Sequence, residues 1–147
     1  FDAYNINNTD DNDNRKNKRR LGRMILKLDM TSDIPIYQQI RNQIVFGIAK
    51  GNLNPGDSLP TVRQLAKEIG VNPMTVNKAY ALLKDEGVIV IDRRHGAQIN
   101  VCKVAGEALD QDFHQRLELL LSEARMKGVS KQEIKSYMED LINRIYT

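Results

Sequence analysis

The residues of this chain best able to act on another molecule are polar and cationic side chains between positions 60 and 96. Arg63 stands near the start of one predicted short helix, and Thr75, Asn77 and Lys78 stand near the start of the next. Arginine and asparagine can make paired hydrogen bonds to base edges, whereas threonine and lysine suit phosphate groups. These residue types in this order predict contact with nucleic acid.

The position of Arg63 breaks a local rule. Thr61 and Gln64 form a capping-box sequence, which puts Arg63 at the second helical position. The helix dipole disfavours a cation there by roughly a few tenths of a kcal/mol. Such a violation often marks a functional residue. The alternative is an exposed arginine paired with a nearby acid such as Glu68.

Other kinds of chemistry have little support in the sequence. It contains no glycine-rich phosphate loop, no nucleophile with an accompanying base and no paired carboxylates in a plausible pocket. His95, Cys102 and His114 do not have the spacing of metal ligands. We therefore expect no enzymatic activity, no cofactor and no metal site, and a structural role for Cys102.

Composition sets the broad class. The 147 residues carry a net charge of +3, which is too small to predict a partner, so the placement of the charges must decide. The single cysteine excludes an intrachain disulfide and is typical of a reducing cytoplasm. No signal-peptide pattern and no apolar run of membrane-spanning length is present, so we expect a cytoplasmic protein without a membrane partner.

Two short helices must position the candidate side chains. The first follows the Thr61 cap and ends at Gly70. The second has Asn72 as its N-cap and Pro73 at its first position, and it runs to about Glu86. The short separation around Gly70 is typical of a helix-turn-helix.

An earlier helix and a later hairpin flank this pair. The helix runs from Pro35 to about Lys50, and its apolar stripe is Ile36, Ile40, Ile44 and Ile48. The hairpin joins Val88–Ile91 to Ala97–Val101. Its tip carries Arg93, Arg94, His95 and Gly96, which suits a minor groove and its flanking phosphates. A solvated charged turn is the alternative.

Two amphipathic helices are predicted after the hairpin, from about Val104 to Lys127 and from a second capping box at Ser130. Their apolar stripes are richer than one helical hairpin can cover, which predicts a homodimer. The alternative is that both helices pack on the preceding domain. The interface residues we expect are Leu109, Phe113, Leu117, Leu120, Leu121, Ile134, Met138, Leu141, Ile142 and Ile145.

The stretch from Pro35 to Arg94 resembles the GntR family of bacterial regulators. The marks are Pro35 with Tyr37, Pro55-Gly56-Asp57, Leu59-Pro60-Thr61-x-Arg63-x-Leu65-Ala66, Gly70-Val71-Asn72-Pro73-x-Thr75-Val76 and Glu86-Gly87. The short C-terminal part is similar to that of the YtrA-like subfamily. The chain departs from the family at Asn77, where arginine is frequent, and at Arg94-His95-Gly96-Ala97, where Gly-x-Gly-Thr is frequent.

The resemblance implies a bacterial, nucleoid-associated winged-helix repressor that binds DNA as a dimer. Members of the YtrA-like subfamily commonly control neighbouring transporter operons. The resemblance also implies that Arg63 contacts a pseudo-palindromic operator in double-stranded DNA. Only 45 residues follow position 102, too few for the effector domain of larger GntR regulators, so no small-molecule effector is identified.

The predicted architecture is mainly α with a small β-hairpin. We expect a disordered or added tail at 1–23, a winged helix-turn-helix domain at 24–102 and two dimerisation helices at 103–147. Two other functions stay open: a regulator gated by an effector or metal at the C-terminal helices, and a winged-helix protein-interaction module. The expected DNA contacts are Arg63, Asn72, Met74, Thr75, Asn77, Lys78, Arg93, Arg94, His95 and Gly96.

Overall fold

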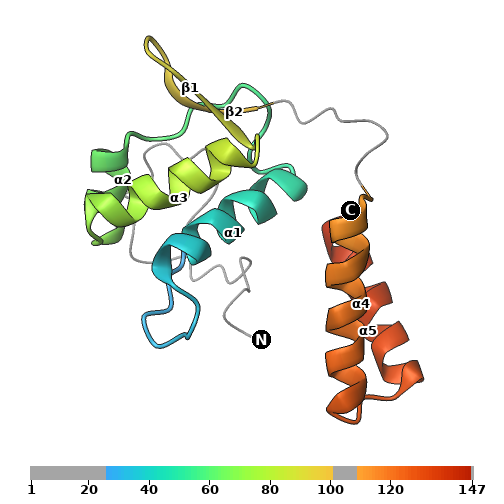
Figure 1. Cartoon of the computed structure of the whole chain (residues 1–147). Coiled ribbons are helices and arrows are strands. Elements are labelled where there is room, and N and C mark those ends of the chain that lie inside the picture. The colour runs from blue at the N-terminus through green and yellow to red at the C-terminus, as the bar shows by residue number, and fades with distance from the viewer. Residues whose placement is uncertain (1–25, 101–108, 147) are drawn as a thin grey trace, which may run out of the picture. The chain divides into compact units, whose positions relative to one another are not determined.

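A computed structural model of the chain describes residues 26–100 and 109–146. The chain divides into two compact units, Phe1–Cys102 and Lys103–Thr147. The expected tail at 1–23 and Cys102 lie outside the described residues. The described elements follow the order α1-α2-α3-β1-β2-α4-α5 (Figure 1), which confirms the predicted class, mainly α with one small hairpin.

The first unit is built on the helices α1 (Ile36–Ala49), α2 (Val62–Ile69) and α3 (Pro73–Asp85). Both α1 and α2 pack against α3 (Figure 1). The isoleucine stripe of α1 faces this contact, since Ile40 and Ile44 are fully buried. The core is completed by other apolar side chains of the unit, among them Leu53, Leu65, Val76, Leu83, Ile89 and Ile99.

The predicted caps fix the turn between α2 and α3. The Thr61 hydroxyl accepts a hydrogen bond from the backbone N–H of Gln64, and the Gln64 side chain accepts one from the N–H of Thr61. Gly70 ends α2 at φ 71°, in the left-handed region where glycine has no steric penalty. The Asn72 side chain then accepts from the N–H of Met74 at 2.8 Å. The predicted helix-turn-helix is therefore confirmed.

The hairpin consists of β1 (Ile89–Asp92) and β2 (Gly96–Ile99), paired antiparallel. Ala97 and Ile99 are buried, as the alternation of β2 predicts. The sequence did not reveal that β2 has a second partner. The loop before α2 runs along its other edge, because Leu59 N–H donates to the Ala97 carbonyl at 2.8 Å and Ile99 N–H donates to the Asp57 carbonyl at 2.9 Å.

Two buried glutamines of α1 hold the segment that leads into it. The Gln39 side chain accepts from Asp29 N–H at 2.9 Å and donates to the carbonyls of Asp29 and Ile34. Gln43 accepts from Lys27 N–H at 2.7 Å and donates back to the Lys27 carbonyl. The two glutamine side chains thus satisfy backbone N–H and C=O groups of a segment that is not part of a β-sheet.

An ion pair ties α1 to the end of α3. Arg41 Nη2 lies 2.8 Å from Glu86 Oε2, and Arg41 Nε also donates to the same carboxylate at 3.0 Å. The two groups are about one-third exposed, so the pair adds little stability but fixes orientation. The sequence places these residues 45 positions apart and offers no signal for their contact.

Tyr80 links α3 to the loop that precedes α2. Its side chain is buried, and its hydroxyl donates to the Pro60 carbonyl at 2.8 Å. Burial raises the pKa of Tyr80, with a smaller contribution from the negative charge of Glu68. The phenol therefore stays protonated and remains a hydrogen-bond donor over the ordinary pH range.

We expect Tyr80→Phe to lower the free energy of unfolding by about 1–3 kcal/mol, because the buried Pro60 carbonyl loses its donor. Urea denaturation measures this change. Tyr37→Phe is the matched control, since no hydrogen bond of the Tyr37 hydroxyl occurs within the described ranges. It should change stability by no more than about 0.5 kcal/mol. Equal losses in the two variants would contradict the role assigned to the Tyr80 bond.

The second unit is the hairpin of α4 (Gln111–Met126) and α5 (Lys131–Ile145). The first of these helices was predicted to start near Val104. Residues 104–108 lie outside the described part. The prediction is wrong for Leu109 and Asp110, because α4 begins only at Gln111. The reason is that the Asp110 side chain caps α4 by accepting from Phe113 N–H at 2.8 Å. The predicted capping box of Ser130 and Glu133 is confirmed.

Candidate nucleic-acid interface

The predicted face of α3 points outward. Met74, Asn77 and Lys78 are exposed and Thr75 is half-buried, whereas the opposite side of the helix is buried in the core. Met74 is 78% exposed, and its flexible apolar side chain is available for contact with a ligand. The polar and cationic groups expected to read DNA are thus available on one helix.

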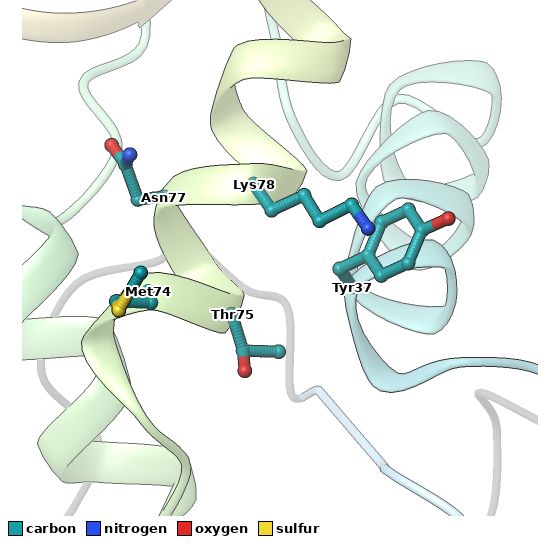
Figure 2. A pocket seen from close by; sticks show the side chains of 5 residues that line it. All are labelled: Tyr37, Met74, Thr75, Asn77 and Lys78. Atoms are coloured by element: carbon teal, nitrogen blue, oxygen red, sulfur yellow. The ribbon is translucent and has the colours of Figure 1, made fainter.

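A shallow hollow of about 550 Å³ lies over this face, lined by Tyr37, Met74, Thr75, Asn77 and Lys78. Figure 2 shows that Lys78 reaches across it from α3 towards the ring of Tyr37 on α1. The Lys78 ammonium lies 4.0 Å from the centroid of that ring, a cation–π contact. Tyr37 was not predicted as a site residue, because its position beside the isoleucine stripe of α1 is equally typical of a core tyrosine.

Asn72 has a structural role besides its predicted DNA contact. Its side-chain oxygen caps α3 by accepting from Met74 N–H. Its amide NH₂ group takes no part in the cap and can donate to a phosphate or a base. The DNA contact of Asn72 stays a prediction.

Arg63 occupies the second position of α2 and is exposed. The alternative was an ion pair between Arg63 and Glu68. In the described part of the chain, no acid lies within ion-pair distance of Arg63. A cation at the positive end of a helix dipole without a compensating acid is locally unfavourable. The unfavourable placement is consistent with a ligand that is negatively charged.

Asp92 organises the tip of the hairpin. One of its carboxylate oxygens accepts from the N–H groups of Arg94 and His95, the latter at 3.1 Å, and lies 3.4 Å from Nδ1 of His95. The bonds from these two N–H groups lower the pKa of Asp92. Gly96 completes the turn at φ 72°. The side chains of Arg93 and Arg94 are exposed, with no ion pair among the described residues.

We expect replacement of Arg93 and Arg94 together by alanine to weaken DNA binding while changing thermal stability by no more than about 0.5 kcal/mol. The reason is that Asp92 holds the turn through the backbone N–H groups of Arg94 and His95, so the side chains of Arg93 and Arg94 are not needed for it. A filter-binding assay and a melting curve measure the two quantities. Lys127→Ala with Lys131→Ala removes the same charge from the second unit and should leave binding nearly unchanged. A large fall in melting temperature would show that the arginines are structural.

Other kinds of site find little support in the part of the chain that the structure describes. Within the described ranges, no three His, Cys, Asp or Glu side chains gather where they could hold a metal ion. His114 lies on α4 beside Phe113, with ring centroids 6.1 Å apart. None of the helices in residues 26–100 and 109–146 is long and apolar enough to cross a membrane.

Comparison with known proteins gives a consistent picture. The sequence pattern of the bacterial regulatory proteins of the gntR family matches residues 36–99. The HTH-type transcriptional repressor YtrA of Bacillus subtilis is 34% identical over 119 residues, which cover 80% of this chain and 92% of that protein. This match extends well beyond the region of the family pattern.

Solved structures show the same architecture. YtrA from Sulfolobus acidocaldarius, a GntR-family transcription factor, is 41% identical, with a TM-score of 0.56 over 69% of this chain and 98% of the other. A transcriptional antiterminator from Listeria monocytogenes is 28% identical, with a TM-score of 0.76 over 84% of this chain and 93% of the other. These relatives are transcriptional regulators, in agreement with the expectation that the chain is not an enzyme. The chain belongs to the gntR family of bacterial regulatory proteins, which are DNA-binding transcription regulators with a winged helix-turn-helix.

Proposed function

We propose that this protein represses transcription by binding a pseudo-palindromic operator as a homodimer. The observation that carries the proposal is the outward polar face at the start of α3, Thr75, Asn77 and Lys78, together with the exposed cation Arg63 at the start of α2. A recognition helix presents its N-terminal residues to base edges in the major groove. Repression is inferred from similarity to a Bacillus subtilis repressor.

In the proposed complex, α3 lies in the major groove. Asn77 is suited to adenine, because its amide donates and accepts side by side, and Thr75 is suited to a phosphate or a thymine methyl group. Arg63 sets the register of the helix on the duplex. The hairpin tip, with Arg93, Arg94 and His95, lies along the adjacent minor groove and its phosphates.

The second unit supplies the proposed dimer interface. No residue of α4 or α5 is buried within a single chain. Leu120 is 62% exposed, and several other large apolar side chains of the unit are also exposed: Leu109, Phe113, Leu121 and Ile142. Monomeric proteins rarely tolerate such a patch, whereas a two-fold copy of the same hairpin would close a small bundle.

A dimer also matches the geometry of DNA. Two recognition helices must reach half-sites roughly 34 Å apart, one turn of the duplex, so that an inverted repeat is read by two-fold-related surfaces. A bound dimer would exclude RNA polymerase from an overlapping promoter in the cytoplasm. By family resemblance, the regulated genes would be a neighbouring transporter operon.

The test is to select bound fragments from genomic DNA with the full chain and to titrate the recovered sequences in gel shifts at several salt concentrations. We expect an inverted repeat that is bound at least about 1,000-fold more tightly than random duplex, the lower end for specific regulators. Binding should weaken steeply with salt, because phosphate contacts release counterions. Recovery of fragments that share no motif, or of no DNA at all, would contradict the proposal.

A further inference from the structure

The contact between Tyr37 and Lys78 joins two segments that the sequence keeps far apart. Lys78 is exposed on α3, and its ammonium lies 4.0 Å from the centroid of the Tyr37 ring on α1. Figure 2 shows the lysine stem extended across the hollow, with its nitrogen over the ring. The contact therefore holds one particular cation of the candidate interface.

The two partners differ in stiffness. Tyr37 is half-buried and packs against the hydrophobic core, so its ring is fixed by its surroundings. Lys78 carries a flexible four-carbon stem whose rotamer freedom must be lost whenever its ammonium binds a ligand. A fixed ring face beneath the ammonium removes part of that freedom before the ligand arrives.

An aromatic ring restrains a cation without neutralising it. An acid at the same place would compete with an anionic ligand for the ammonium, whereas the ring face offers only its quadrupole. No acid forms an ion pair with Lys78 within the described ranges. The Lys78 ammonium therefore lies beside Thr75 and Asn77 without a competing carboxylate from the described part of the chain.

We propose that Tyr37 is a positioning residue for recognition of the DNA backbone: its ring face holds the Lys78 ammonium in place for a backbone phosphate. The inference rests on the proposed function, because it requires that this face of α3 meets DNA. Phosphate contacts carry no sequence information. The contribution of Tyr37 is therefore the same for operator and for random duplex.

A double-mutant cycle with the full chain tests this assignment. Tyr37→Leu removes the ring face and weakens binding to operator and to a random-sequence duplex by about two- to five-fold, the range of an exposed cation–π contact. Tyr37→Phe keeps the ring face and retains the affinity. In the Lys78→Ala background, Tyr37→Leu has no further effect. Both Lys78→Ala and the double variant show a plot of log binding constant against log salt concentration whose slope is shallower by about one.

Two controls separate positioning from general damage. Lys84→Ala removes a cation from the last turn of the same helix, so Tyr37→Leu keeps its full effect in that background. Binding is measured below the melting temperature of the least stable variant. The assignment is overturned if Tyr37→Leu binds as tightly as the wild type, or if its effect is equally large with and without Lys78.

A second measurement does not depend on the folding of any variant. The Lys78 Hε resonances of the DNA-free wild-type protein shift upfield because of the Tyr37 ring current. Resonances that fall among those of the other lysines overturn the proposal. Failure of the wild type to bind either duplex contradicts the proposed function instead, whereas normal binding with unaffected Tyr37 variants contradicts this inference alone.

Discussion

Leu120→Asp is expected to turn the full-length protein into a monomer and to weaken its binding to operator DNA by about 100-fold or more. Leu120 is 62% exposed within one chain, so the substitution costs the isolated helical hairpin little. In the proposed dimer the same side chain is buried, where an unpaired carboxylate is strongly unfavourable. Loss of the second half-site contact removes a gain in avidity of about 100- to 10,000-fold.

Leu119→Asp is the matched control for this substitution. Leu119 precedes Leu120 and is 59% exposed, but successive residues of a helix point about 100° apart. Leu119 is also absent from the predicted apolar stripe of α4. Light scattering at micromolar concentration should find a dimer for Leu119→Asp and a monomer for Leu120→Asp. A dimeric Leu120→Asp protein would place the interface on another face.

Arg63→Ala is expected to weaken operator binding by about five- to 150-fold, which corresponds to about 1–3 kcal/mol for a bidentate contact to a base. Binding to random duplex should change much less. The same variant should be slightly more stable, by roughly a few tenths of a kcal/mol, because a cation leaves the positive end of α2. Opposite signs for affinity and stability would distinguish a ligand contact from a structural role.

Lys67→Ala is the control for Arg63. It removes an exposed cation from the last turn of the same helix, and it should reduce operator binding far less than Arg63→Ala does. Fluorescence anisotropy with both duplexes measures the affinities, and urea denaturation measures the stabilities. Equal operator affinity for Arg63→Ala and the wild type would contradict the proposed register contact.

The parts of the fold that could be predicted from the sequence are those determined by neighbours along the chain. Thr61 and Gln64, Asn72 and Pro73, and Ser130 with its partner glutamate are caps that span a few residues, and all appear where they were expected. The start of α4 was predicted too early because the expected helix, from about Val104 to Lys127, includes Asp110, whose side chain caps the helix instead.

The features that could not be predicted depend on contacts between distant segments. The second partner of β2 is a loop with few strand-like residues, and its pairing is made by backbone groups that have no sequence signature. Tyr37 and Lys78 each fit an ordinary local pattern, and only the packing of α1 against α3 brings them together. The exposed face of α3 follows from helical periodicity, which is a local pattern. The position of Tyr37 beside that face depends on tertiary packing and could not be predicted.

The hydrogen bonds from Gln39 and Gln43 to the segment that leads into α1 restrict which amino acids can occupy these two positions. Each glutamine uses one amide to accept from a backbone N–H and to donate to a backbone carbonyl, so glutamate lacks the donor and methionine lacks both groups. Positions 39 and 43 should therefore be as invariant among relatives as a DNA contact. Invariance in this family would then mark two separate things, the reading of an operator and the anchoring of the segment that leads into α1, and only the side chain's surroundings distinguish them.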